Sequence, residues 1–505
     1  MAASPLLLFK YGYSTILLIF SITLIMGLIF TEQTKLAADV HPALAFIVLW
    51  VLVIWLSMVE GGQASLVGLA PVNRELYKDS HPICYKCTSI AHKGDNLDRY
   101  LMGRQFMVIF IVFMINMAGN PIADADLWGL PDWIQNIFFT TGFAMILYVC
   151  MVGQLNTQVN ASHCMLDYLN SYFGLFTLCV AMTIEFSGFM HCSYLIQMLV
   201  GALSGKPIES NEPPKSGFTL IFFWARALMS LAVLSFCLAV TLAALFDGKT
   251  TMWDGVPEAV SVILFFLLMS VVGLLEGMQI AFFAVAKIPK SERGDNIFAK
   301  KTCELLFKGK GRNLPGFMIG RQLCVVTCFF VVARVTSLEI EDGETNVFGV
   351  SDGLQNFFNT GLCGAVITTI LGSISWQLVA SAFPIAMLSN PFTYVFLNIC
   401  LFLEATGIAS GAWVLAMIHK KIAGFKRDEE YIGTAEERAA KNMGDNAEEL
   451  HIGAGHALKL PGFADNAPEG LKELFSKDPS VREYIEGYME ESARKLAEAE
   501  AGESN

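Results

Sequence analysis

Charged residues are scarce in this chain of 505 residues, and their scarcity excludes several classes of protein. Only 16% of the residues are Asp, Glu, Lys or Arg, whereas about a quarter are charged in an ordinary soluble protein. The 34 Lys and Arg are outnumbered by 46 Asp and Glu, so we expect no nucleic-acid partner. The 12 Cys lie mostly inside apolar runs, which argues against a secreted disulfide scaffold.

Sequence motifs for catalysis are also missing. No Gly-rich phosphate loop, Ser/His/Asp set or paired acid–base constellation stands out. We therefore expect no enzyme activity, no coupling to ATP and no organic cofactor.

Long apolar runs are what the chain has instead. A helix needs about 20 mainly apolar residues to cross a bilayer, and ten segments meet this requirement. The first has no small-residue cleavage site after it, so we interpret it as a retained helix. The sequence predicts an all-α polytopic membrane protein embedded in lipid, with spans near 13–30, 43–60, 104–119, 134–154, 172–200, 218–246, 256–275, 319–336, 356–384 and 391–419.

The last part of the chain has a different composition. Residues 421–505 hold 30 of the 80 charged side chains, and 19 of these are acidic. We interpret this segment as a soluble cytoplasmic tail. Near its end, apolar residues recur at helical spacing and predict a terminal amphipathic helix; they are Val481, Tyr484, Ile485, Tyr488 and Met489. A coiled coil that assembles a homo-oligomer is the alternative to a solvated helix.

The membrane region contains an internal repeat. Glu60-Gly61-Gly62-Gln63 recurs as Glu276-Gly277-Met278-Gln279, and Gly103-Arg104-Gln105 recurs as Gly320-Arg321-Gln322. Further matches at similar offsets join Gln158 to Gln377, Glu185 to Glu404 and Gly188 to Gly407. The sequence therefore predicts two homologous halves, 1–217 and 218–420, followed by the tail at 421–505. Duplicated membrane bundles are typical of secondary transporters, whose sites lie at the repeat interface.

Two orientations of the halves are open. Five spans per half favour a second half that is inverted relative to the first. However, loops 72–103 and 285–319 carry five and eight Lys and Arg, while loops 120–132 and 337–353 carry none. The positive-inside rule would place both basic loops in the cytoplasm, which requires parallel halves. Counting 156–171 and 375–390 as extra crossings, six per half, satisfies that rule.

Repeated polar residues in the membrane region form a candidate binding site. Placing a carboxylate at the bilayer centre costs at least about 2.5 kcal/mol, so we expect each intramembrane Glu to have a structural or functional role. The Glu and Gln of each first motif share a helix face, and the Gly residues between them permit a helix break or close packing. Such a site offers oxygen acceptors and amide donors to a small neutral polyhydroxylated solute. The alternative interpretation of the Glu and Gln residues is a turn at the membrane boundary, and that of the two Arg is anchoring at the membrane interface. The candidate substrate-binding residues are Glu60, Gln63, Arg104, Gln105, Glu276, Gln279, Arg321 and Gln322.

Other polar groups are candidates for binding cations. Glu185 and Glu404 lie inside long apolar runs, so we interpret them as candidates for a coupling ion, with a buried protonated Glu as the alternative. The loop residues His81, Cys84, Cys87 and His92 have the ligand types of zinc, although the spacing is not that of a standard finger. A disulfide is the competing interpretation for the two Cys.

The sequence resembles the silicic acid transporters of diatoms and related silicifying algae. That family is marked by duplicated E-G-x-Q and G-R-Q motifs, which match the four segments above, and by a C-M-L-D motif, which matches Cys164-Met165-Leu166-Asp167. The resemblance implies about ten helices, cytoplasmic termini, a helical tail with coiled-coil character and sodium-coupled uptake of silicic acid. Asp167 aligns with Ala386, so this element is not duplicated; ion coupling and packing are both open for it.

The resemblance predicts a Na⁺/silicic acid symporter in the plasma membrane, with an internal or silica-deposition vesicle membrane as the alternative. A passive channel for small neutral hydroxylated solutes and a membrane sensor that signals through the tail are the competing functions. Sodium independence of uptake would favour the channel.

Overall fold

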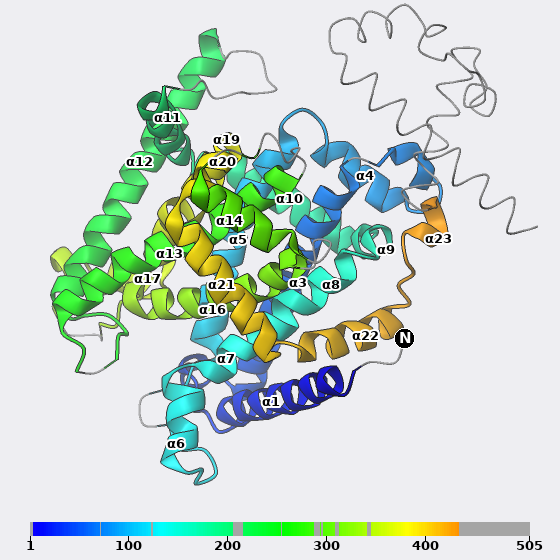
Figure 1. Ribbon diagram of the computed structural model, residues 1–505. Helices are drawn as coiled ribbons and strands as arrows, with labels where there is room; N and C mark the ends of the chain where they lie inside the picture. Colours follow the sequence, from blue (N-terminus) through cyan, green and yellow to red (C-terminus); the bar gives the residue numbers. More distant parts are fainter. Residues whose placement is uncertain are drawn as a thin grey trace, which may run out of the picture. The chain divides into compact units, whose positions relative to one another are not determined.

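The structure is a computed structural model that describes residues 4–70, 72–122, 125–205, 216–253, 255–286, 293, 296–308, 313–340 and 345–433. Regular structure in these residues is helical, apart from isolated bridges from Thr34 to Pro121 and from Thr250 to Leu338. Seven of the described helices are long and apolar enough to cross a membrane, and two bent pairs raise the number to nine. The chain is therefore an all-helical membrane protein (Figure 1).

Each predicted span coincides with a helix or a group of consecutive helices. The first half contains α1 (Pro5–Phe30), α2 (Lys35–Asp39), α3 (Pro42–Leu69), η1 (Arg74–Tyr77), α4 (Pro82–Ala91), α5 (Asn96–Gly119), α6 (Asp132–Gln135), η2 (Asn136–Thr140), α7 (Phe143–Tyr148), η3 (Val149–Leu155), α8 (Asn156–Ala161), α9 (Met165–Leu169), α10 (Tyr172–Phe186) and α11 (Ser193–Ser204). The second half contains α12 (Gly217–Phe246), α13 (Glu258–Ala286), α14 (Ile297–Leu306), α16 (Asn313–Thr336), η5 (Val347–Gly349), α17 (Asp352–Asn359), α18 (Leu362–Thr369), η6 (Ile370–Ile374), α19 (Ser375–Ala382), α20 (Pro384–Ser389), α21 (Pro391–Thr406) and α22 (Gly411–Ala423).

Contacts divide the chain after Arg427, so both predicted halves belong to one compact unit. The second unit begins at Asp428 and includes the short helix α23 (Glu429–Ile432). The predicted amphipathic helix of the tail lies outside the described residues.

Capping residues and glycines set where the helices begin and end. The Ser4 hydroxyl accepts a hydrogen bond from the Leu7 amide at the start of α1, and Asn390 caps α21 in the same way. Both helices have Pro in their first turn, where its missing N–H costs nothing. Gly142 and Gly361 precede α7 and α18 with φ of 72° and 76°, a conformation that glycine adopts without steric cost.

The ends of helices from both halves meet at one face of the membrane unit. The loop after α1 pairs with the end of α5 through the bridge from Thr34 to Pro121. The loop after α12 pairs with the end of α16 through the Glu339 amide, which donates to the Lys249 carbonyl at 3.2 Å. The two pairs are joined by an ion pair of 2.6 Å between Lys35 and Glu339.

These contacts argue against the inverted arrangement that five spans per half favoured. An inverted second half would place the ends of α12 and α16 on the membrane face opposite the ends of α1 and α5. The contacts instead join all four ends, which favours the parallel alternative. Within residues 156–171 and 375–390, α8 and α19 continue the preceding helices, and α9 and α20 are only one to two turns long.

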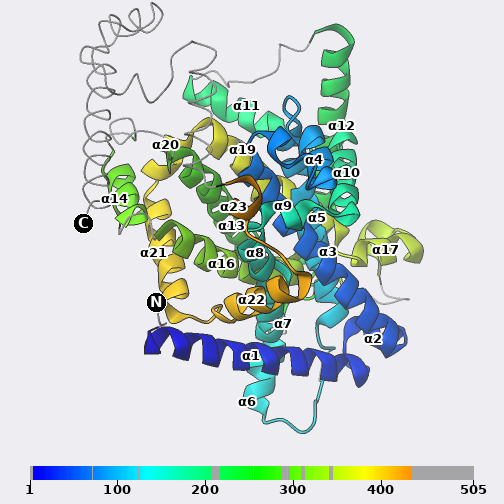
Figure 2. The same cartoon turned by 90° about the vertical axis from the view of Figure 1, so that its right-hand side faces the viewer.

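The last two helices of each half pack against the first helix of the other half. Figures 1 and 2 show α22 (orange) running alongside α1 (blue), and α11 lies near one end of α12. The Ser14 hydroxyl of α1 donates to the Ile408 carbonyl, between α21 and α22, at 2.6 Å. The Ser230 hydroxyl of α12 donates to the Phe189 carbonyl, between α10 and α11, at 2.7 Å. Carbonyls freed by the two helix breaks are thereby satisfied across the halves, as buried backbone groups require.

Candidate functional site

Two ion pairs lie at the centre of the membrane unit. Glu60 of α3 pairs with Arg104 of α5, and Glu276 of α13 pairs with Arg321 of α16, each with a closest distance of 2.8 Å. All four side chains are buried, with exposed fractions of 3–5%. Removing such charges from water costs several kcal/mol per ion, and close pairing offsets this cost. The two Arg therefore do not anchor the helices at the membrane surface.

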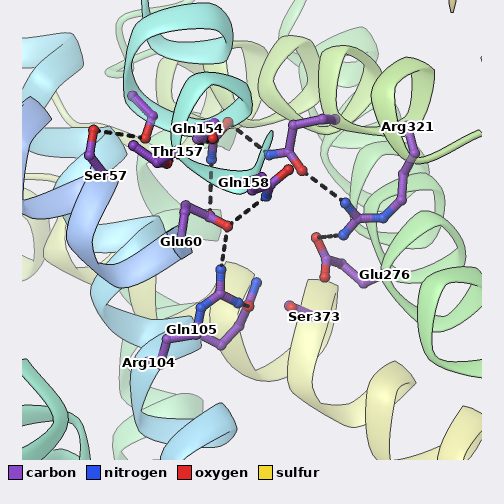
Figure 3. Close-up of polar contacts among 12 residues, drawn as sticks. Ser57, Glu60, Arg104, Gln105, Gln154, Thr157, Gln158, Glu276, Arg321 and Ser373 are labelled. Atoms are coloured by element: carbon purple, nitrogen blue, oxygen red, sulfur yellow. Dashed lines mark hydrogen bonds and ion pairs between the residues drawn. The ribbon is translucent and has the colours of Figure 1, made fainter. Parts of the chain in front are cut away.

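Amide side chains complete the hydrogen bonding of both carboxylates. Gln158 of α8 donates to Glu60 at 2.9 Å, and Gln377 of α19 donates to Glu276 at 2.8 Å. Gln154 of η3 also donates to Glu60, at 3.2 Å (Figure 3). Each carboxylate thus accepts hydrogen bonds from at least two side chains, as buried polar groups require.

The ion pairs surround a polar pocket between the two halves. All eight residues predicted as substrate-binding line it, together with Gln154, Gln158, Val108, Val325 and Phe329. The free space is small, because only about 10 Å³ is open to the centre of a water molecule. That is about the space one water requires, so the pocket is narrow in this structure.

The helices run unbroken through the E-G-x-Q motifs, so the helix break that the Gly residues would permit does not occur there. Glu60 and Gln63 lie within α3, and Glu276 and Gln279 lie within α13. The glycine of the first motif serves close packing, because a Cβ on Gly61 would overlap the Tyr168 ring. The glycines of the G-R-Q motifs have the same function.

Irregular helix lies on the other side of the pocket. Gln154 is in the π-helical segment η3, and Ser373 holds the matching position in η6. Single π-helical turns inside helices are frequent at functional sites. The Ser57 hydroxyl of α3, one turn before Glu60, donates to the Gly153 carbonyl at 3.2 Å and so holds η3 against α3.

The sequence analysis did not identify Gln154 and Ser373, and it noted Gln158 and Gln377 only as repeat matches. A signal existed for Gln154, because it precedes Gln158 by four residues inside an apolar run. Residues at that spacing share a helix face. No comparable signal marks Ser373.

A family model described as silicon transporter matches residues 2–504 of this chain. The chain belongs to the silicon transporter family. The match confirms the resemblance carried by the motifs and supports a transport function for silicic acid, in a family of transporters and not of enzymes. No curated protein and no solved structure matches the chain.

The ion-coupling candidates of this silicon transporter lie away from the pocket. Glu185 is buried in the last turn of α10, and its carboxylate lies 3.5 Å from the His191 ring. Glu404 lies in the last turn of α21, just before Gly407. Both therefore mark the points where a helix pair breaks.

Asp167 of the C-M-L-D motif connects three segments outside the pocket. One carboxylate oxygen lies 3.1 Å from the His81 ring. The other accepts a hydrogen bond from the Lys426 amide at 2.6 Å, just after α22. Asp167 thus joins the first basic loop to the end of the membrane unit.

The structure does not bring the four zinc candidates together. His81 faces Asp167, whereas the His92 ring is hydrogen bonded to the Leu66 carbonyl at 2.8 Å. Cys84 and Cys87 lie buried on α4. Among the described residues, no group of three or more His, Cys, Asp or Glu side chains is arranged to hold a metal.

Proposed function

We propose that this protein moves silicic acid across a membrane by alternating access, with the pocket between its two ion pairs as the substrate site. The observation that supports this proposal is that the pocket is narrow and is lined mainly by polar side chains from both halves. Substrate sites of secondary transporters lie at such repeat interfaces.

The chemistry of the pocket suits a neutral substrate. Two Glu and two Arg pair with each other, so the ion pairs carry no net charge. Orthosilicic acid is neutral near neutral pH, and its four hydroxyl groups both donate and accept hydrogen bonds. Amide side chains provide both functions, and five Gln line the pocket near the pairs: Gln63, Gln105, Gln154, Gln158 and Gln279. The sixth is Gln322, and both Gln279 and Gln322 come from the second half.

The small free space in the pocket favours a transporter over a passive channel. A channel needs a continuous open path, whereas a pocket with room for about one water must open before silicic acid enters. Opening and closing around a fixed site is the hallmark of alternating access.

We further propose that sodium drives uptake and binds away from the silicic acid site. The pocket carboxylates are already neutralised by Arg, which makes them poor cation ligands. Glu185 and Glu404 follow the geometry of half-helix ends that coordinate Na⁺ in other transporters. The non-duplicated Asp167 is a further candidate. Loss of sodium dependence in Glu185→Gln or Glu404→Gln, with silicic acid binding retained, would support this assignment.

We infer a parallel arrangement with eight complete crossings. In each half, three long helices and one bent or irregular helix cross the membrane. The last two helices of each half, α10 with α11 and α21 with α22, enter from the cytoplasmic face and return to it. Both basic loops then face the cytoplasm, as the positive-inside rule requires. The plasma membrane is the proposed location, because uptake from outside requires it.

Uptake of silicic acid into proteoliposomes, with and without an inward sodium gradient, tests the proposed function. We expect accumulation above equilibrium only with the gradient. Sodium-independent equilibration of silicic acid would indicate a channel or uniporter and would refute the symporter. No flux by folded protein would refute transport of silicic acid.

A further inference from the structure

The two halves of the pocket differ at one pair of matching positions. Gln154 and Ser373 each lie four residues before the Gln that donates to the carboxylate of their own half. Both side chains are fully buried. The longer Gln154 reaches across to the other half, which Ser373 is too short to do.

Gln154 connects the halves through Gln322. The Gln322 amide nitrogen donates to the Gln154 oxygen at 2.7 Å, and the Gln154 nitrogen donates to Glu60. The Gln322 oxygen accepts from Arg321 at 3.0 Å. Both ends of the Gln322 amide are therefore occupied by protein groups.

Gln105, the counterpart of Gln322, has one end of its amide unoccupied. Its oxygen accepts from Arg104 at 2.7 Å, but its nitrogen makes no hydrogen bond with any described residue. The side chain is only 2% exposed and lines the pocket. In Figure 3 no dashed line joins Gln105 to Ser373.

The neighbouring Arg shows the same difference. Arg104 Nε is buried without a hydrogen-bond partner, whereas Arg321 Nε donates to the Leu275 carbonyl at 3.0 Å. Buried donors without partners are costly and are rare in folded proteins. Unsatisfied donors therefore gather in the half of the pocket that contains Gln105.

We propose that the Gln105 amide nitrogen, which Ser373 is too short to reach as Gln154 reaches Gln322, binds a hydroxyl oxygen of silicic acid in the pocket, while the hydrogen bond between Gln154 and Gln322 connects the two halves. This inference rests on the proposed function and makes the site asymmetric despite its repeated motifs. It predicts that the two G-R-Q glutamines are not equivalent.

Alanine variants of the two glutamines are a matched test. We measure the half-saturation concentration for silicic acid uptake by proteoliposomes of the full chain. Gln105→Ala should raise it at least tenfold more than Gln322→Ala does. Equal effects, or a larger effect of Gln322→Ala, would overturn the proposal.

Exchanging the two positions tests the cause. Ser373→Gln should occupy the Gln105 nitrogen and raise the half-saturation concentration at least tenfold. In the double variant Gln154→Ser/Ser373→Gln, the greater sensitivity to alanine should move from Gln105 to Gln322. A double variant in which Gln105→Ala is still the more damaging would refute the proposal. Absence of uptake by the wild-type protein would instead refute the proposed function.

Discussion

Glu60 and Glu276 are carboxylates within apolar helices, and each is contacted by an Arg and by an amide side chain. Each residue of the G-R-Q motif makes a different interaction. The glycine allows close helix packing, the arginine pairs with the carboxylate of the same half, and the glutamine lines the pocket. Exchange of any one for a similar residue would therefore disturb a different interaction.

Neutralising one member of a buried ion pair should destabilise the fold. Glu60→Gln leaves Arg104 charged and buried without its partner, which we expect to cost about 3–5 kcal/mol. The apparent Tm of purified protein in detergent, together with silicic acid uptake, measures the effect. Both quantities should fall.

The double variant Glu60→Gln/Arg104→Gln is the control, because it removes both charges. Its apparent Tm should lie closer to that of the wild-type protein than the Tm of Glu60→Gln does. An unchanged Tm in Glu60→Gln would mean that the pair is accessible to water and not buried.

At the scale of helices, two glycines allow the pocket to form. A Cβ on Gly103 would overlap the Ala181 carbonyl of α10, and one on Gly320 would overlap the Cys400 carbonyl of α21. Each glycine immediately precedes the Arg of an ion pair. The distance between the helices therefore determines whether the Arg reaches its carboxylate.

Gly103→Ala should separate α5 from α10 and displace Arg104. Because the clash is with backbone, we expect a loss of about 1–3 kcal/mol together with reduced uptake. Gly12→Ala in α1 is the matched control, since a Cβ there meets nothing within 4 Å. It should leave the apparent Tm unchanged or raise it, because Ala favours helices. A Tm for Gly103→Ala as high as that of the control would contradict the close packing.

Docking of the first basic loop on α3 should depend on pH. Burial lowers the pKa of His92 below its ordinary value of 6.5, with the hydrogen bond to the Leu66 carbonyl opposing the shift. Below this value the unfolded chain binds more protons than the folded chain, so stability should decrease as the pH falls through 6.5.

A comparison of the wild-type protein with His92→Gln isolates this effect. Gln retains a donor for the Leu66 carbonyl but does not titrate. Between pH 7.5 and 5.5 the apparent Tm of the wild-type protein should fall further than that of the variant. Identical decreases would show that His92 titrates with its ordinary pKa.

For the whole molecule, the orientation of the halves is the main consequence of the tertiary contacts. One isolated bridge joins helix ends within each half, and the ion pair between Lys35 and Glu339 connects these ends across the halves. An even number of crossings per half follows when α10 with α11, and α21 with α22, return to the face from which they enter.

Cysteine labelling from outside the cell tests this orientation. Asp132→Cys and Asp352→Cys, at the exposed starts of α6 and α17, should both react with a membrane-impermeant thiol reagent above the wild-type level. Lys86→Cys and Lys300→Cys, exposed on the basic loops, should react only after permeabilisation. With inverted halves, Asp132→Cys and Asp352→Cys would lie on opposite sides of the membrane, and so would Lys86→Cys and Lys300→Cys.

The sequence by itself determined the class of protein, the positions of its apolar helices and most of the pocket lining. Apolar runs long enough for the bilayer predict helices wherever they occur, and the repeated motifs identified eight residues that line the pocket. The family follows from the same motifs. These inferences succeed because hydropathy and residue chemistry are local properties of the chain.

Only the tertiary structure decided how the parts meet. Three features depend on residues that are far apart in the sequence: the ion pair of Glu60 with Arg104, the hydrogen bond of Gln154 with Gln322, and the contact between the helix ends of the two halves. Counting apolar spans could not distinguish a crossing from a helix pair that turns back, since both have the same composition. Packing across the halves makes this distinction, because it determines which carbonyls, charges and helix ends find partners.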